Sequence, residues 1–375
     1  MAKAPKIALV TDWLTNMGGA EPLLLEVHKL FPDAPIYTSV YNKEKMAAFH
    51  DCDVRTTYLQ ERLPAFIRYK HVLWPVARAK AFRSLDLSEY DIIISTSSAE
   101  AKAVRKTRPE QVHIAYIHTP IRYYWSHYEE FRREFNFGPL TPLIRPFIPF
   151  FVKKMRVKDL ESIEGIDVFI ANSTVTQSRI KEYYKRPSTV VHPPVDIDRF
   201  TPPAKTDRTG YVLWGRHVPY KRFDLAIEAC NRLKVPLTVI GSGPDTDRLK
   251  SLAGPTVTFT GRVSDEELVE RAHHAKGFLF PNEEDFGISA VEAIAAGTPV
   301  IAYAKGGALD IVQDGETGVL FPEQTVESLM AAIQRAETIE FRASTLHRKS
   351  KRFARGLFAQ KITKIVRDNT PPTIQ

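Results

Sequence analysis

Short apolar runs alternate along this chain with longer segments in which apolar residues recur every three or four positions. The predicted strands are 6–11, 34–40, 90–96, 113–119 and 167–173 in the first half, and 211–215, 237–241, 257–261, 277–281 and 299–304 in the second half. Short buried strands separated by helical segments indicate parallel sheets built from β-α-β units. The two series therefore predict an α/β protein with two doubly wound, Rossmann-like domains.

A proline-rich segment separates the two series of strands. Residues 191–210, VHPPVDIDRFTPPAKTDRTG, contain two Pro-Pro pairs that interrupt both the strand and the helix pattern. We expect an N-terminal domain over residues 1–192, a linker over 193–209, a second domain over 210–350, and a C-terminal helix and tail over 351–375.

The composition is that of an ordinary folded protein, with 43% hydrophobic and 26% charged residues among 375. Cys52 and Cys230 form no CxxC pair and no metal-type spacing with histidine, which favours a reduced compartment. The opening MAKAPKIALVTDWL has too short an apolar run for a signal peptide, and no stretch approaches the roughly 18 apolar residues of a membrane span. We therefore expect a cytoplasmic protein.

Positive charge is concentrated in the first half of the chain. The net charge is +8, and residues 1–190 carry 28 Lys and Arg against 21 Asp and Glu. Within this half, Arg62–Arg83 holds six basic and no acidic residues among large apolar side chains. A second stretch, Phe137–Arg156, mixes aromatic and basic residues with four prolines that exclude one continuous helix. Both stretches suit an anionic membrane surface, and core packing with solvated basic side chains is the alternative.

Basic residues also crowd the start of a predicted helix in the second half. In GRHVPYKRFDLAIEA a strand ends near Gly215 and a helix begins near Lys221. Arg216, Lys221 and Arg222 therefore lie at the positive end of the helix dipole. A diphosphate would relieve their repulsion, with Arg216 binding as a fork and Lys221 as a point charge. A solvated basic turn is the alternative.

Glycine turns follow several of the predicted strands. Gly18 and Gly19 precede the first helix, and further turns lie at 241–244 and 306–307. Glycine lets backbone N–H groups approach a phosphate closely, although a tight turn needs the same residue. Because ligands of such sheets bind beyond the carboxyl ends of the strands, we expect these turns to line one cleft.

Two carboxylates follow the predicted strand 277–281. Glu284 lies in the loop after this strand, and Glu292 lies about one turn into a short helix. Glu292 is the only charged residue between Asp285 and Lys305. A carboxylate in this apolar setting is costly unless it is hydrogen-bonded, and a vicinal diol such as a ribose offers two donors. An exposed glutamate on the free face of the helix is the alternative.

Four motifs carry a resemblance to a known family. They are E-x7-E with Phe and Gly after the first Glu (Glu284, Phe286, Gly287, Glu292), R-x4-K (Arg216, Lys221), GGAE (18–21) and GxVSDEEL (261–268). This combination resembles the retaining glycosyltransferases of family 4, which share the GT-B architecture. The pieces DWLTNMGGAE, YDIIISTSS, IHTPIRYYW and GRHVPYKRFDLAIEA are most similar to bacterial mannosyltransferases of that family, which use GDP-mannose to extend lipid-linked or surface polysaccharides.

The resemblance implies two Rossmann-like domains facing a cleft, a C-terminal helix that crosses back to the N-domain, and roles for individual residues. The implied donor-binding residues are Gly18, Gly19, Gly241, Arg262, Val263, Phe286, Gly287, Ile288 and Glu292. The implied catalytic residues are His118, Arg216, Lys221 and Glu284. Asp12 and Arg122 are weaker candidates for contacting the acceptor, and Pro22 departs from the basic residue common after GGAE.

The implied reaction needs no cofactor and no metal. In family members the acceptor hydroxyl attacks from the face that the diphosphate leaves, and charge and positioning carry the rate. Three D-x-D triplets, at 51–53, 196–198 and 245–247, lie away from the expected diphosphate site. We expect a nucleotide-sugar donor, a glycolipid or polysaccharide acceptor, and a position on the inner face of the cytoplasmic membrane.

The alternatives to this interpretation are another sugar donor, another enzyme of the same fold and a nucleic-acid-binding protein. A UDP-sugar donor would use the same motifs. A phosphorylase of this fold should be longer and carry a pyridoxal lysine, and an epimerase should show a different carboxylate spacing. A basic nucleic-acid-binding protein should add an aromatic stacking platform or a reading helix to its charge, and neither is found in the sequence. We therefore expect no nucleic-acid partner.

Overall fold

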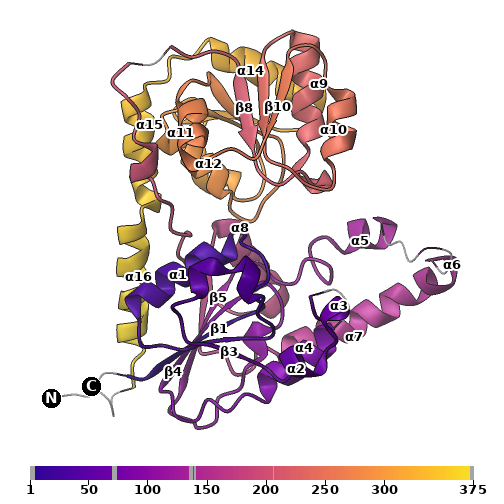
Figure 1. Ribbon diagram of the computed structural model, residues 1–375, viewed down its shortest axis with the longest axis vertical. Helices are drawn as coiled ribbons and strands as arrows, with labels where there is room; N and C mark the ends of the chain where they lie inside the picture. Colours follow the sequence, from indigo (N-terminus) through magenta and orange to yellow (C-terminus); the bar gives the residue numbers. More distant parts are fainter. Residues whose placement is uncertain (1–4, 70–73, 135–137, 139–140, 206, 372–375) are drawn as a thin grey trace. The chain divides into compact units, whose positions relative to one another are not determined.

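The computed structural model of the protein describes residues 5–69, 74–134, 138, 141–205 and 207–371. The chain divides into two compact units, shown in Figure 1. The first unit consists of Met1–His192 with Ala359–Gln375, and the second of Pro193–Phe358. Each unit is built around its own parallel sheet, which confirms the prediction of two doubly wound, Rossmann-like α/β domains.

The sheet of the first unit has seven parallel strands in the order β3-β2-β1-β4-β5-β6-β7. They are β1 (Ile7–Thr11), β2 (Ile36–Thr38), β3 (Val54–Thr56), β4 (Ile92–Ser97), β5 (Val112–Ile117), β6 (Val168–Ala171) and β7 (Thr189–Val190). Every residue of β1 and β4 is buried, as expected for central parallel strands with helices on both faces. The strand order reverses between β1 and β4, where sheets of this kind bind ligands.

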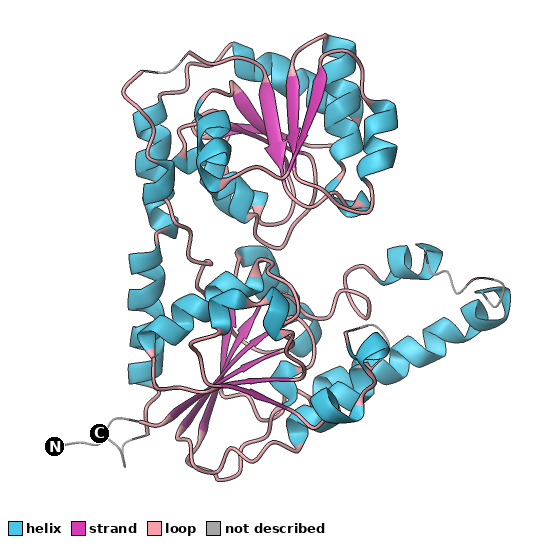
Figure 2. Ribbon diagram, viewed as in Figure 1, coloured by secondary structure: helices cyan, strands magenta, loops and turns pink. Residues whose placement is uncertain are grey.

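Helices connect the strands of the first unit (Figure 2). They are α1 (Ala20–Leu30), α2 (Leu59–Arg62), α3 (Ala65–Arg68), α4 (Pro75–Arg83), α5 (Tyr128–Glu134), α6 (Thr141–Ile144), α7 (Ile148–Glu161) and α8 (Thr174–Arg179), with a π-helical turn at Ile180–Tyr184. A 3-10 turn, Arg145–Phe147, separates α6 from α7, so the prolines do exclude one continuous helix there. Residues 70–73, 137 and 139–140 of the two basic and apolar stretches lie outside the described residues.

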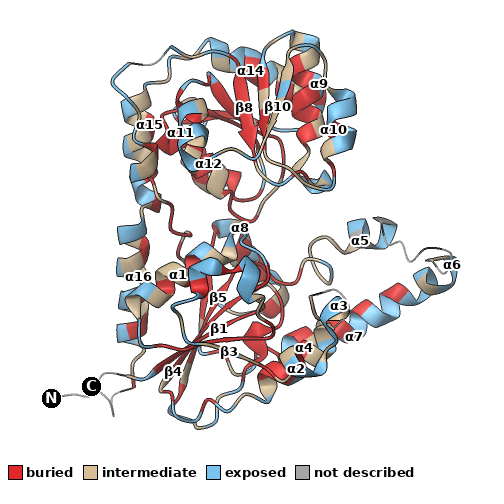
Figure 3. Ribbon diagram, in the orientation of Figure 1, coloured by how far each residue is buried: buried red, intermediate tan, exposed pale blue. Residues whose placement is uncertain are grey.

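The second unit has six parallel strands in the order β10-β9-β8-β11-β12-β13. They are β8 (Tyr211–Trp214), β9 (Leu237–Ile240), β10 (Val257–Gly261), β11 (Gly277–Phe280), β12 (Val300–Tyr303) and β13 (Gly318–Phe321). The helices are α9 (Phe223–Leu233), α10 (Thr246–Leu252), α11 (Asp265–His273), α12 (Ile288–Ala295), α13 (Ala308–Ile311), α14 (Val326–Glu337) and α15 (Ala343–Ser350). One apolar core joins the sheet to these helices, and Figure 3 shows β8 coloured as buried, whereas no residue of the edge strand β10 is fully buried.

Three short strands were missed by the sequence pattern. β3, β7 and β13 are all edge strands, which pair with a neighbour on one side only. β3 and β7 have the sequences VRT and TV, too short and too polar to form an apolar run. An edge strand is partly solvated, so it needs fewer apolar residues than a central strand.

The last helix, α16 (Arg355–Asp368), begins in the second unit, and its residues from Ala359 onward group with the first unit. Phe358, Ile362 and Val366 recur every four residues along α16 and are buried. No helix among the described residues is both long enough and apolar enough to cross a membrane.

Candidate functional site

Glycines bring two loops into direct contact at the carboxyl edge of the second sheet. Gly241 follows β9 with φ of +117°, and a Cβ atom there would lie 2.0 Å from the carbonyl oxygen of Gly215. A Cβ atom on Gly243 would lie 2.2 Å from the carbonyl oxygen of His217. Because only glycine permits these distances, the loops after β8 and β9 pack backbone against backbone.

The turn after β10 joins the same cluster. The N–H of Gly241 donates to the carbonyl oxygen of Gly261 at 2.7 Å. Arg262 is exposed, and its Nε donates to Oγ of Ser242 at 3.3 Å. Val263 is partly buried and packs against the core of the unit. Three of the residues predicted to bind the donor, Gly241, Arg262 and Val263, are therefore neighbours.

The basic segment after β8 makes a turn before its helix begins. Pro219–Lys221 form a 3-10 turn and α9 starts at Phe223, two residues later than the sequence predicted. Arg222 lies between them with a left-handed φ of 52°. Arg216 is exposed, whereas the side chain of Lys221 is only 14% exposed. The two predicted diphosphate ligands therefore lie in different environments.

Lys221 and Glu284 were predicted to bind one ligand, and they lie in direct contact. Nζ of Lys221 is 2.5 Å from Oε1 of Glu284, whose side chain is 17% exposed. Nδ2 of Asn282 donates to the same oxygen at 2.9 Å. Charge-assisted hydrogen bonds of this kind fix the orientation of both side chains. The loops that follow β8 and β11 thus meet at a cation and a carboxylate.

The glycine pair after β12 fixes the loop that carries Glu284. The N–H of Gly307 donates to the carbonyl oxygen of Glu284 at 2.8 Å. A Cβ atom on Gly306 would lie 2.3 Å from that oxygen, and one on Gly307 would lie 2.1 Å from the carbonyl oxygen of Phe286. These glycines therefore allow two loops to touch, and the contact sets the position of Glu284.

Glu292 lies in the second turn of α12 and is partly exposed. Nε1 of Trp214, the last residue of β8, donates to its Oε2 at 3.0 Å. Burial raises the pKa of the Glu292 carboxyl group above its usual value. Glu292 is therefore not the freely exposed glutamate of the alternative interpretation. Trp214 was not among the predicted site residues, and the signal for it in the sequence was an indole donor at the end of a strand, before Gly215.

Phe286, Gly287 and Ile288, which were predicted to bind the nucleotide-sugar donor, lie at the start of α12. Gly287 precedes the helix with φ of +112°, and a Cβ atom there would lie 2.9 Å from the ring of Phe280. Phe286 is buried, with its ring 5.6 Å from that of Phe353. The first N–H groups of a helix have no acceptor within the helix, so those around Ile288 form a positive helix end beside the Glu284 loop.

In the first unit, Gly18 and Gly19 lie between β1 and α1. The N–H of Gly18 donates to Oε2 of Glu21 at 2.7 Å, and Gly19 caps α1 with φ of −84°. Neither glycine has the left-handed backbone that excludes other residues. A phosphate contact at this pair stays a prediction, and it would have to displace Glu21 from Gly18.

Asp12 holds a loop, and its contact with the acceptor stays a prediction. Its side chain is buried after β1. Oδ1 accepts from Oγ of Ser97 at 3.0 Å and from the N–H of Ala101 at 2.7 Å. Oδ2 accepts from the N–H groups of Ser98 and Ala99 at 2.7 and 3.0 Å. Both oxygens are committed to the loop after β4.

His118 directly follows β5, and its side chain is partly exposed. Its ring packs edge-on to Tyr116 at 5.3 Å, its N–H donates to the carbonyl oxygen of Ser97 at 2.9 Å, and its carbonyl oxygen accepts from Thr176. Arg122, also partly exposed, lies in the turn that follows. Both residues thus lie at the carboxyl edge of the first sheet, and their roles stay predictions.

Among the residues that the structure describes, no three His, Cys, Asp or Glu side chains are grouped to hold a metal ion. Aspartates of the three D-x-D triplets form ion pairs with arginines: Asp53 with Arg55, Asp196 with Arg355 and Asp245 with Arg248. That the reaction needs no metal stays a prediction.

Comparison with known families identifies the second unit. Residues 194–355 match the family described as "Glycosyl transferases group 1". These residues form a glycosyl transferases group 1 domain. The group 1 domain holds the Lys221–Glu284 pair, the Trp214–Glu292 pair and the glycine loops described above.

The chain resembles several curated proteins through this domain. It is 32% identical over 203 residues to the GDP-mannose-dependent alpha-(1-6)-phosphatidylinositol monomannoside mannosyltransferase of Mycobacterium tuberculosis, covering 45% of this chain and 52% of that protein. It is 32% identical over 197 residues to the D-inositol 3-phosphate glycosyltransferase of a Nocardioides species, covering 42% of this chain and 43% of that protein. The matches thus span about half the length of these relatives.

Solved structures resemble the chain over nearly its full length. Anabaena HepE in complex with UDP has a TM-score of 0.72 at 18% identity, covering 97% of this chain and 100% of that one. Sucrose-phosphate synthase from Thermosynechococcus elongatus has a TM-score of 0.69 at 19% identity, covering 97% and 98%. The fold of the chain is that of GT-B glycosyltransferases.

Proposed function

We propose that the protein is a retaining glycosyltransferase that moves a hexosyl group to a lipid-linked or polysaccharide acceptor at the inner face of the cytoplasmic membrane. Mannose from GDP-mannose is the proposed donor group, which the similarity to the mycobacterial mannosyltransferase supports. The observation that carries the proposal is the Lys221–Glu284 pair, which lies beside the helix of Glu292 in a group 1 domain.

The diphosphate of the donor would bind Arg216 and Lys221. Arg216 is exposed, so its guanidinium can form a two-pronged contact with phosphate oxygens. Lys221 forms an ion pair with Glu284. A diphosphate competes for the same ammonium group, so its binding would release Oε1 of Glu284 for the hydroxyl groups of the sugar.

Glu292 would bind the ribose of the nucleotide. Trp214 already donates to one of its two oxygens, which fixes the carboxylate plane before the ligand arrives. Gly241, Arg262 and Val263 form the neighbouring surface, where the base would lie. Gly19 of the first unit stays a predicted contact of the diphosphate.

In the proposed reaction the acceptor hydroxyl oxygen bonds to the anomeric carbon on the face that the diphosphate leaves. The bond between that carbon and the diphosphate oxygen breaks, and the hydroxyl proton passes to the leaving phosphate oxygen. Arg216, Lys221 and the N–H groups of Phe286, Gly287 and Ile288 stabilise the negative charge that develops. His118 would lie near the anomeric carbon, and neither cofactor nor metal takes part.

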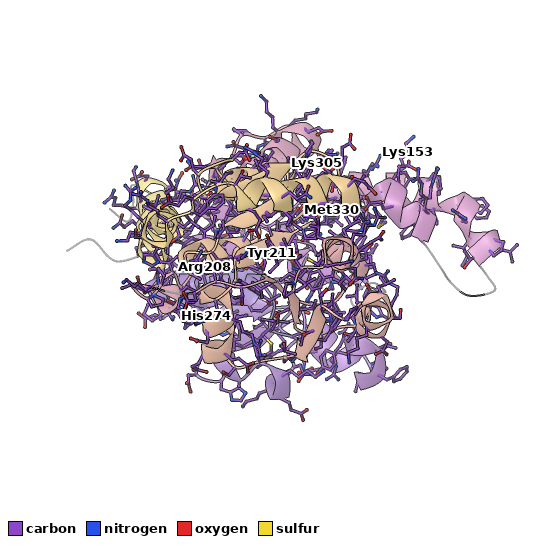
Figure 4. All side chains as sticks on the ribbon, turned by 90° about the horizontal axis from the view of Figure 1, so that it is seen from above. Lys153, Arg208, Tyr211, His274, Lys305 and Met330 are labelled. Carbon is purple, nitrogen blue, oxygen red and sulfur yellow. The ribbon has the colours of Figure 1, made fainter. Side chains whose placement is uncertain are left out.

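A membrane partner is supported by exposed aromatic and basic side chains on the first unit. Phe66 of α3 is 76% exposed and Phe150 of α7 is 74% exposed. Lys153, labelled in Figure 4, and Lys154 lie beside Phe150 on α7 and are exposed. Aromatic side chains that enter the interface and cations that meet anionic headgroups together support peripheral attachment.

The donor is tested by thermal unfolding of the protein with GDP, UDP, ADP and their common sugars, each with and without a chelator. A ligand that binds only the folded state raises the unfolding temperature. Stabilisation by GDP and GDP-mannose that survives chelation is expected. Stabilisation by UDP-sugars alone would indicate a UDP-sugar donor in place of GDP-mannose, and UDP is the nucleotide bound in the HepE structure. No response to any nucleotide would overturn the proposed function.

A further inference from the structure

A cavity of about 210 Å³ lies within the first unit, between α4 and α7. The loops that follow β4 and β5 close its inner end. Asp12 accepts five hydrogen bonds from Ser97–Ala101, which fix the position of the first of these loops. Because these loops follow β4 and β5, the cavity lies at the carboxyl edge of the sheet. None of the site residues predicted from the sequence lines it.

Two carboxylates line the inner end, and each is neutralised by a buried cation. Nε of Arg78 lies 2.8 Å from Glu100, and Nζ of Lys102 lies 2.8 Å from Asp159. Trp125 also donates to Asp159, at 2.7 Å. These carboxylates thus have their countercharges outside the cavity, and they do not cancel the charge of the other lining groups.

Three cations line the cavity, namely Lys80, Arg83 and Lys158. Glu161 lies 3.8 Å from Arg83 and 4.0 Å from Lys158, and it is itself exposed. Ion pairs this long between solvated groups contribute little. The three cations therefore leave a local excess of positive charge, which favours an anion with several oxygens.

The remaining wall is apolar and leads to the surface. Val76 and Ala79 of α4 face Met155 of α7 across the cavity, and Val76 is 46% exposed at its mouth. On the same helix as Met155, Phe150 and Phe151 are 74% and 53% exposed. A ligand with an anionic head would thus find an apolar path from the cavity to exposed aromatic side chains.

We propose that this cavity binds the phosphate end of an amphiphilic acceptor. Lys80, Arg83 and Lys158 hold the phosphate oxygens, and Val76, Ala79 and Met155 contact the first methylene groups of the chain. The inference rests on the proposed function, because it specifies a phosphorylated lipid as the acceptor class. The phosphorylated lipid and inorganic phosphate both carry phosphate oxygens that these cations could bind. The experiment must therefore distinguish the two ligands.

The test is calorimetric titration with dodecyl phosphate below its critical micelle concentration, with inorganic phosphate and neutral dodecyl maltoside as comparison ligands. The variant Lys80→Ser/Lys158→Ser removes two exposed or half-exposed cations of the cavity. The matched control Lys43→Ser/Lys45→Ser removes two exposed cations of the first unit that do not line it. The first pair should weaken dodecyl phosphate binding about tenfold or more, because two charge-assisted contacts are lost, and the control should bind like the wild type.

A second variant, Ala79→Leu, fills the cavity without changing charge and should also weaken binding of dodecyl phosphate. Equal losses in both lysine pairs, or inorganic phosphate binding as tightly as dodecyl phosphate, would overturn the proposal. GDP and UDP should stabilise Lys80→Ser/Lys158→Ser as they stabilise the wild type. If nucleotides bind and dodecyl phosphate does not, this inference fails while the proposed function stands.

Discussion

At the residue scale, each candidate carboxylate of the second unit is held by a polar side chain from the segment at the end of β8. Lys221 holds Glu284, and the Trp214 indole holds Glu292. Both partners come from the end of β8 or the turn that follows it, whereas both carboxylates follow β11. A single hydrogen bond does not fully offset the free-energy cost of partly burying a carboxylate. Glu292 therefore lowers the stability of the folded protein, while its carboxylate can still accept hydrogen bonds from a ribose.

Glu292→Gln should stabilise the ligand-free protein at neutral pH while weakening nucleotide binding. The folded-state pKa of Glu292 is raised above 4.5. The contribution of Glu292 to the free energy of unfolding is therefore complete below pH 4.5, and it is lost as pH rises through the folded-state pKa. Glutamine keeps an oxygen acceptor for Trp214 but carries no charge. Unfolding temperatures of the two proteins should therefore coincide near pH 4 and separate by about pH 8, with the variant higher.

A variant that is less stable than the wild type across this whole range would contradict the argument. It would mean that the ionised carboxylate gains more from Trp214 than it loses by burial. Nucleotide affinity, measured on the same samples, separates this result from a change in the fold.

Glu284→Ala should remove sugar transfer and leave nucleoside diphosphate binding largely intact. Lys221 stays to bind the diphosphate, while the group that orients the sugar is lost, and positioning of this kind contributes about 100-fold or more to rate. Glu283→Ala is the matched control, because it removes the same charge one residue earlier in the same loop. Full transfer activity in Glu284→Ala would refute the assignment of the site.

At the element scale, α7 has apolar residues on two sides. Ile148, Val152 and Met155 are buried at spacings of four and three residues, and Phe150 and Phe151 are exposed between them. An amphipathic helix with a single partner has one apolar face. The second face therefore indicates a second apolar environment, which the proposed membrane surface would supply.

Phe150→Ser/Phe151→Ser should loosen attachment to anionic vesicles, with an affinity loss of about tenfold or more, because burying one phenylalanine contributes about 1.5–3 kcal/mol. Vesicle sedimentation measures the effect. Leu252→Ser/Leu309→Ser is the control, since both leucines are exposed in the second unit. Equal vesicle binding by the phenylalanine variant and the wild type would count against a membrane face on α7.

The same scale shows what the sequence could and could not predict. Apolar runs identified every central strand, because those strands are buried on both faces, and turn glycines located the loops of the site. Local pattern did not predict the partners of Asp12, because Ser98 and Ala99 lie more than 80 residues away. It also did not predict the Lys221–Glu284 contact, because pairing between side chains 63 residues apart depends on the packing of the loops.

At the scale of the whole molecule, buried histidines should make folding sensitive to acid. His113 of β5 is fully buried beside Oγ of Ser95, and burial lowers its pKa to about 4. Its stabilising contribution is thus complete above the usual value of 6.5 and is lost as pH falls toward 4. The loss reaches about 3 kcal/mol, from 1.36 kcal/mol per pKa unit.

Urea unfolding of the wild type and of His113→Gln at about pH 7 and about pH 5 tests this expectation, since the linkage predicts a smaller loss in the variant. Other buried histidines, such as His217, remain in both proteins, so the difference between the two isolates His113. Identical losses of stability would show that His113 does not titrate in this window.

The course of α16 bears on how the chain is made. The first unit takes its last segment from residues after Ala359, and the whole second unit lies between its two parts. During synthesis the ribosome therefore releases Pro193–Phe358 as one uninterrupted stretch, which can fold while the first unit still lacks Ile362 and Val366. The unit that comes first along this chain is thus completed last. Nascent chains that stop before α16 should therefore expose the incomplete first unit to chaperones.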